Sequence, residues 1–148
     1  MTALSGIRVL ELSESVAGEY CGKLLSDFGA ELIKFERPGV GSPTRRMAPY
    51  APTGADPERS GLFAYLNTGK RSVEVDVTTP GGRETLQQLL GRVDVVIDDH
   101  ADGWLQSVGL DPAALDEAHP HLVLCSITAF GQSPPEERRH AEDLTVFQ

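Results

Sequence analysis

The sequence has 148 residues, of which 40% are apolar and 24% are charged, so it is long enough for one globular domain. Its formal net charge of −9 argues against a nucleic-acid-binding surface, because phosphate contacts along a duplex need a cationic face. No apolar run approaches the length of a membrane-spanning helix, and Arg8, Glu11 and Glu14 are not expected in a signal-peptide core. Cys21 and Cys125 lie in apolar segments, which is typical of buried thiols in a reducing compartment, so we expect a cytoplasmic protein.

The first part of the chain predicts a strand, a helix and a second strand. Residues 7–12 form a β-rich run, and the serine-containing turn after it offers good helix N-caps. Apolar residues then recur at helical spacing and predict one buried helix face, made of Ala17, Tyr20, Cys21, Leu24, Leu25 and Phe28. Residues 31–36 predict the second strand. With connections this short, the two strands should be parallel and joined by a right-handed crossover.

Residues 37–61 form a long stretch without periodicity that contains five prolines and four glycines. A loop of this length inside a compact domain is usually functional or wraps a partner. The stretch overlaps a basic island at residues 37–71, which contains six basic residues and two acidic ones, Asp56 and Glu58. The net charge of the island is +4, and that of the rest of the chain is −13. The island indicates either a compact anionic ligand or arginines paired with neighbouring acids, and charge alone does not decide between them.

The second half of the chain predicts three more strands. Residues 72–77 alternate valine with polar residues, as in a half-exposed strand, and Thr79-Pro80 is typical of a helix start. Residues 95–97 predict a central parallel strand, residues from Asp111 to before Pro120 a short helix, and residues 122–127 a fifth strand. The fold class is therefore α/β, with an open, mostly parallel Rossmann-like sheet and helices on both faces. In such sheets, ligands bind beyond the carboxyl ends of the strands, here after residues 12, 36, 97 and 127.

Familiar cofactor motifs are absent from this sequence. The turn after the first strand contains neither the GxGxxG nor the P-loop pattern, although the helix start at residues 16–18 could hold an anion through backbone N–H groups. Spacing alone favours a simple helix cap there. The cluster Asp98, Asp99, His100 and Asp102 suggests a metal site or a solvated acidic loop; adjacent residues on one short loop rarely converge on one ion, so we expect no metal.

Four segments together resemble the class III coenzyme A transferase family, which includes formyl-CoA and carnitine-CoA transferases and 2-methylacyl-CoA racemases. In order along the chain, these are VLEL at residues 9–12 followed by Ala17-Gly18, LSDFGAELIKFERPG at 25–39, NTGKRSVEVD at 67–76 and HPHLVLCSITAFGQ at 119–132. Their order and spacing cover the whole chain. The resemblance implies that residues 1–148 form a CoA-binding Rossmann-like domain, incomplete relative to the family, with residues 37–61 as its long loop.

The resemblance also implies a set of CoA-binding residues. Arg37 matches an arginine near the adenine-nucleotide end of CoA, and Lys70-Arg71 matches a basic pair near its phosphates. The remaining residues expected around CoA are Val16, Ala17, Asp99, His100 and His140. Coenzyme A, as substrate or ligand, is the expected cofactor.

Departures from the family pattern limit what the resemblance implies. The turn from Asp99 to Gly103 replaces an Asn-Phe-Arg-Pro-Gly-like turn, and Ser107 stands where a second arginine is expected. Carboxylates near a phosphate disfavour binding. Residues 133–136 replace a Gly-Pro-Tyr segment. Glu142-Asp143 replaces the His-Asp pair of racemases, which makes the racemase branch a poor match.

Family members are more than twice as long as this chain, and two copies interlock. The transferase's nucleophilic aspartate lies downstream of the position of Asp143, so we expect no catalytic nucleophile within the chain and only a possible assisting role for Asp143. We therefore expect a transferase-like domain that is inactive alone and needs a missing C-terminal portion or partner subunit, with the complete protein a homo-oligomer. The alternatives are a non-catalytic scaffold domain that has lost CoA binding and an unrelated nucleotide-binding domain.

Overall fold

The computed structural model describes residues 2–51 and 56–131 of the chain. In this part of the chain, five strands form one parallel sheet in the order β3-β2-β1-β4-β5. The strands are β1 (Arg8–Glu11), β2 (Glu31–Glu36), β3 (Arg71–Glu74), β4 (Val95–Asp98) and β5 (Val123–Ser126). The helices are α1 (Val16–Asp27), α2 (Gly61–Asn67), α3 (Pro80–Leu90), α4 (Trp104–Ser107) and α5 (Pro112–Ala118), with short 3-10 helices at Pro43–Arg46 and Pro57–Arg59. The predicted open, parallel α/β fold is confirmed.

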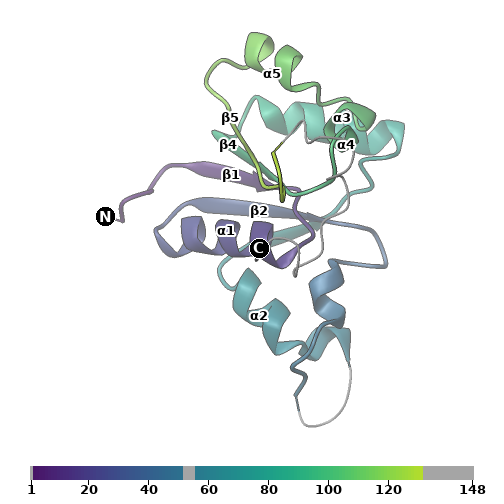
Figure 1. Cartoon of the computed structure of the whole chain (residues 1–148). Coiled ribbons are helices and arrows are strands. Elements are labelled where there is room, and N and C mark those ends of the chain that lie inside the picture. The colour runs from purple at the N-terminus through teal and green to yellow at the C-terminus, as the bar shows by residue number, and fades with distance from the viewer. Residues whose placement is uncertain (1, 52–55, 132–148) are drawn as a thin grey trace.

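Helices cover both faces of the sheet (Figure 1). The larger apolar core lies on the face that α3, α4 and α5 cover and includes Leu10, Leu86 and Val96, all fully buried. A smaller cluster on the α1 face contains Val9, Leu32 and Ile97, with Cys21 and Leu25 packed against it. Because successive strand residues point to opposite faces, Val9 and Leu10 serve different clusters. The two cysteines are free and half-buried rather than fully buried.

The prediction for the buried face of α1 was partly wrong. Tyr20, Leu24 and Phe28 are 42%, 40% and 57% exposed, whereas the face against the sheet carries Gly18, Glu19 and Gly22. A side chain at Gly18 would collide with Asp99, and one at Gly22 would collide with the carboxylate of Glu11. Small residues are needed there because polar side chains of the sheet approach the helix backbone.

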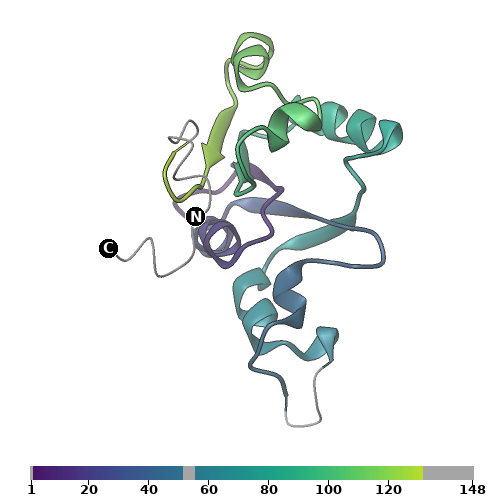
Figure 2. The ribbon, with the colours of Figure 1, turned by 45° about the vertical axis from the view of Figure 1, so that its right-hand side comes forward.

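The described residues of the long loop include the two short 3-10 helices, and α2 follows them. α2 lies beyond α1, in the lower part of the view in Figure 2. Ser60 starts α2 by accepting a hydrogen bond from the Phe63 N–H. No element was predicted for residues 61–67, because a seven-residue helix with Leu66 as its buried residue shows no apolar periodicity.

β3 begins and ends earlier than the predicted strand at residues 72–77. All four of its residues are exposed, since it is an edge strand that pairs with β2 alone. The alternating valines were misleading because Val75 and Val77 pack against the core only after the strand has ended. The predicted helix start is confirmed, as Thr79 caps α3 by accepting from the Gly82 N–H. No helix in the described ranges is both long and apolar enough to cross a membrane.

Candidate functional site

A pocket of about 420 Å³ lies at the carboxyl edge of the sheet. It is lined by the last two residues of β2, by residues that follow β1, β2, β3 and β4, and by Trp104 of α4. The lining consists of Leu12, Glu14, Phe35, Glu36, Arg37, Pro38, Val40, Val75, Asp76, Val77, Thr78, His100 and Trp104. Its volume is within the range of small-molecule sites, and its position is the usual ligand position in open α/β sheets.

Arg37 lies at this pocket and is held by Glu14. Its Nε and Nη2 atoms donate to the two carboxylate oxygens of Glu14 at 2.7 and 2.6 Å. The Arg37 side chain is 62% exposed, whereas that of Glu14 is 19% exposed. This two-point geometry is the same one by which a guanidinium group recognises a phosphate. The Arg37 guanidinium group therefore has the geometry and the exposure to bind an anion, but it is already paired with Glu14.

His100 is the second basic residue in the lining. Its Nδ1 lies 2.7 Å from Asp98 Oδ1, and its Nε2 lies 3.8 Å from Glu14 Oε2. Burial alone would lower the pKa of His100, but the hydrogen bond to Asp98 and the nearby carboxylate of Glu14 outweigh it and raise the pKa to about 9. The ring stacks on Trp104 with centroids 3.5 Å apart. At neutral pH, His100 is therefore a cation with an aromatic neighbour.

Asp99 is directed away from the pocket and toward the start of α1. Its carboxylate accepts hydrogen bonds from the N–H groups of Glu14 and Ser15, both at 2.8 Å, and from the Ser15 hydroxyl. A carboxylate of the chain thus occupies the anion-favouring end of the helix. Val16 and Ala17, the sequence candidates at this position, are exposed on the first turn of α1.

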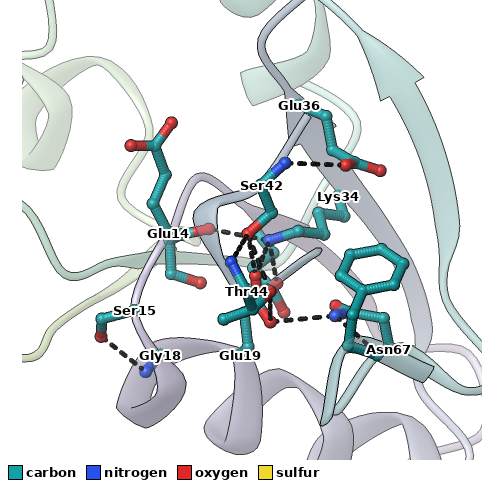
Figure 3. A network of polar contacts seen from close by, with 12 residues as sticks. Glu14, Ser15, Gly18, Glu19, Lys34, Glu36, Ser42, Thr44 and Asn67 are labelled. Atoms are coloured by element: carbon teal, nitrogen blue, oxygen red, sulfur yellow. Dashed lines mark hydrogen bonds and ion pairs between the residues drawn. The ribbon is translucent and has the colours of Figure 1, made fainter. Parts of the chain in front are cut away.

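A buried ionic network lies between α1 and the sheet (Figure 3). Lys34 is 1% exposed, and its Nζ lies 2.9 Å from Glu11 and 3.0 Å from Glu19. Burial alone would lower the pKa of Lys34, but the two carboxylates outweigh it and raise that pKa. Burial also raises the pKa of Glu11, against the opposing effect of Lys34 and Lys70. These charges are paired inside the protein, as buried charges must be.

Glu19 connects this network to the long loop. Its carboxylate accepts hydrogen bonds from Ser42, from Thr44 at 2.7 Å and from the Asn67 amide at 2.9 Å (Figure 3). Ser42 and Thr44 belong to the loop, and Asn67 ends α2. The loop and α2 are therefore fastened to α1 through one buried carboxylate.

The two residues of the predicted basic pair lie apart from the pocket lining. Lys70 is inside the network, where its Nζ lies 2.7 Å from Glu11 Oε2 and its side chain is 2% exposed. Burial lowers the pKa of Lys70, which Glu11 opposes. Arg71 begins β3, at the opposite end of that strand from Val75 in the pocket lining. The structure thus brings Arg37 and His100 together, but places Lys70 and Arg71 elsewhere.

Other arginines of the basic island are also paired. Arg45 donates to both oxygens of Glu36 at 2.7 and 2.9 Å and to Glu58 at 3.0 Å. Burial alone would raise the pKa of Glu36, but hydrogen bonds from Arg45, Ser72 and the Ser42 N–H lower it to about 2. Most basic residues of the island are therefore paired with acidic residues, and Arg37 lies at the pocket.

Some predicted residues cannot be placed or do not converge. His140 and Asp143 lie outside the described residues. Asp98 and Asp99 point to different partners, His100 and the α1 start, and no three metal-ligating side chains gather within the described ranges.

Sequence reasoning did not identify Glu14, Trp104 or the buried role of Lys34. Glu14 carried a usable signal, because it follows the first strand at the edge where ligands bind. The charges of Lys34 and Glu19 gave no such signal, because their burial depends on pairing across the fold.

Comparison with known proteins places the chain in a family. The model of CoA-transferase family III matches residues 4–148. The chain is 42% identical over 134 residues to a succinate–glutarate CoA-transferase from Agrobacterium fabrum, covering 89% of this chain and 34% of that protein. It is 34% identical over 142 residues to a formyl-CoA:oxalate CoA-transferase from Bradyrhizobium diazoefficiens, covering 96% of this chain and 32% of that protein. The chain thus spans about a third of the length of these relatives.

Solved structures agree with this assignment. A CAIB/BAIF family protein from Brucella suis superposes with a TM-score of 0.84 at 37% identity, covering 97% of this chain and 38% of that one. A hypothetical protein from Mycobacterium tuberculosis gives a TM-score of 0.84 at 35% identity, with 97% and 38% coverage. The chain belongs to CoA-transferase family III and corresponds to the N-terminal part of its members.

Proposed function

We propose that this chain is the CoA-binding part of an acyl-CoA:carboxylate CoA-transferase. The observation that carries the proposal is the pocket at the carboxyl edge of the sheet, with Arg37 and His100 in its lining. Family membership gives the ligand class, and the pocket gives a location that an anionic nucleotide fits chemically. The cationic side chains attract phosphate, and the ring surface of Trp104 and His100 suits a purine base.

Arg37 would bind a phosphate of CoA by exchanging one anion for another. Its ion pair with Glu14 is largely at the surface, and surface pairs of this kind contribute about 0–1 kcal/mol to stability. A phosphate can therefore replace the Glu14 carboxylate at little cost while keeping the two-point geometry. His100 adds a second positive charge at neutral pH, since its pKa is raised to about 9.

The complete protein would transfer CoA between carboxylic acids. A carboxylate nucleophile attacks the thioester, and mixed-anhydride and enzyme-thioester intermediates divide the exchange into easier steps. We propose that this nucleophile lies outside residues 1–148, so the chain alone is inactive, and that the complete protein is a homo-oligomer. The relatives are named for succinate, glutarate and oxalate, so we propose a dicarboxylic acid as the acceptor.

Calorimetric titration of CoA into the purified protein tests this proposal. Arg37→Ala should weaken binding about tenfold, which corresponds to ~1.4 kcal/mol, and the loss should shrink at high salt. Arg92→Ala removes the same charge next to β4's amino end and should leave the affinity within about twofold. Equal affinities for wild type and Arg37→Ala would place CoA somewhere other than this pocket.

A second candidate is a scaffold domain that has lost CoA binding. It is favoured by one observation: Glu14 and Asp99 already occupy Arg37 and the start of α1, the two positions most attractive to an anion. Under this alternative, no heat of CoA binding is measured for wild type even at millimolar concentration. The same titration therefore separates the two candidates.

A further inference from the structure

Glu14 is in contact with both basic groups of the pocket. Its two oxygens accept from Arg37, and Oε2 also lies 3.8 Å from His100 Nε2. Arg37 and His100 are the basic residues among those lining the pocket in the described part of the chain. One carboxylate therefore occupies both groups that an incoming anion would use.

The backbone of Glu14 is held by the sheet, whereas its side chain belongs to the pocket lining. Its N–H donates to Asp99 Oδ1 at 2.8 Å, which ties the residue to the end of β4. Its carboxylate is at the edge of the pocket, and its main partner, Arg37, is exposed. An anion can therefore displace the carboxylate without moving the strand or the helix on either side.

The charge of the pocket depends on this residue. The lining carries Glu14, Glu36 and Asp76 against Arg37 and His100, a formal charge of −1 with His100 protonated. Glu36 is neutralised separately by Arg45, and Asp76 is hydrogen-bonded by Thr78. Asp98, outside the lining, faces His100 from β4. Glu14 is thus the carboxylate whose removal would leave both cations of the lining facing the pocket.

We infer that Glu14 sets the anion affinity of this pocket by acting as an internal competitor for Arg37 and His100. This inference rests on the proposed function, because it assumes that the pocket's ligand is the phosphate-bearing end of CoA. It adds that wild-type affinity is held down by the chain's own carboxylate. Glu14→Gln keeps the side-chain shape but removes the charge that competes with phosphate.

The test compares CoA binding by wild type, Glu14→Gln, Glu58→Gln and the double variant Glu14→Gln with Arg37→Ala. Glu14→Gln should tighten binding about five- to tenfold, with a smaller gain at high salt. Glu58→Gln is the matched control: Glu58 is 78% exposed, pairs with Arg45 and is outside the pocket lining, so its change should stay within twofold. In the double variant, the gain in CoA affinity that Glu14→Gln gives should disappear.

Two further readouts keep the inference testable. Thermal unfolding confirms that each variant is folded, and the His100 pKa, measured by NMR, should fall in Glu14→Gln because a nearby carboxylate charge is lost. If Arg37→Ala weakens CoA binding but Glu14→Gln does not tighten it, the inference is overturned and the proposed function remains intact. Binding by none of the proteins would overturn both.

Discussion

On the face of the sheet that α3, α4 and α5 cover, packing depends on apolar side chains such as Leu86 and Val96. On the α1 face, a smaller apolar cluster is accompanied by the buried, paired charges of Glu11, Lys34 and Glu19. The first face is held by removal of apolar surface from water, which is non-directional. The second is held by contacts with fixed geometry, which also fasten the long loop through Glu19. The comparison suggests that the apolar face supplies stability and that the ionic face specifies how the loop attaches.

The largest effect is expected from breaking the ionic face. Lys34→Met should lower the free energy of unfolding by about 3–5 kcal/mol, because it leaves Glu11 and Glu19 buried without this cation. The loss should become smaller as pH falls, since protonation removes the unpaired charge. Urea denaturation at pH 5 and pH 8 measures both effects. Lys23→Met, which breaks a helical ion pair with the exposed Asp27, is the control; a loss as small as the control's would refute the paired-charge description.

The apolar face should respond differently. Leu86→Ala removes a fully buried side chain and should lower the free energy of unfolding by about 2–4 kcal/mol. No ionisable partner is removed, so the loss should be the same at pH 5 and pH 8. The same denaturation experiments measure it. A loss that varied strongly with pH would show that the two faces are not independent.

A substitution at the carboxyl edge of the sheet should have an intermediate effect on stability. The pKa of His100 is raised from 6.5 to about 9, so its charged form stabilises the fold. This contribution, of about 3 kcal/mol, is complete below pH 6.5 and lost as pH rises through 9. His100→Gln should therefore destabilise the protein most at pH 6 and least above pH 9. Thermal unfolding across this range measures the effect, with exposed His121→Gln as control; a pH-independent loss would contradict the ion pairs.

The smallest effect on stability is expected on the outer side of α1. Leu24→Gln should change the free energy of unfolding by less than about 0.5 kcal/mol, because Leu24 is already exposed. It should instead weaken self-association. Val16, Tyr20, Leu24 and Phe28 form an exposed apolar stripe, and burying this stripe against a second molecule is favourable. Light scattering measures the association state. Wild type that remains monomeric from micromolar to millimolar concentration would contradict this expectation.

Much of the fold could be predicted from the sequence because it depends on local patterns. The run at residues 31–36 gave the exact bounds of β2, and Thr79-Pro80 gave the start of α3. The outward stripe of α1 was misassigned because helical periodicity identifies an apolar face without saying which way it points. Here the inward face is made of Gly18, Glu19 and Gly22, which no hydrophobicity pattern selects.

The candidate site could be predicted only in part. The edge of the sheet at which the site lies follows from topology, and Arg37 follows from the resemblance to the family. The internal pairing of that site could not be predicted, because Glu14, Asp99 and Arg37 are far apart in the sequence and meet through the register of β1 against β2 and β4. The same reason explains why Lys70 was expected at a phosphate and is found in the network instead.

The connection between Lys70 and Glu11 also has a consequence for the order of assembly during synthesis. Glu11, Glu19 and Lys34 are available once the first 34 residues have been made, but they place two carboxylates beside one ammonium group. The second ammonium group lies 59 residues beyond Glu11. The charges therefore balance only after the loop and α2 have been synthesised and folded back. Closing that long loop is slow compared with local helix formation, so α1 should dock late on the emerging sheet.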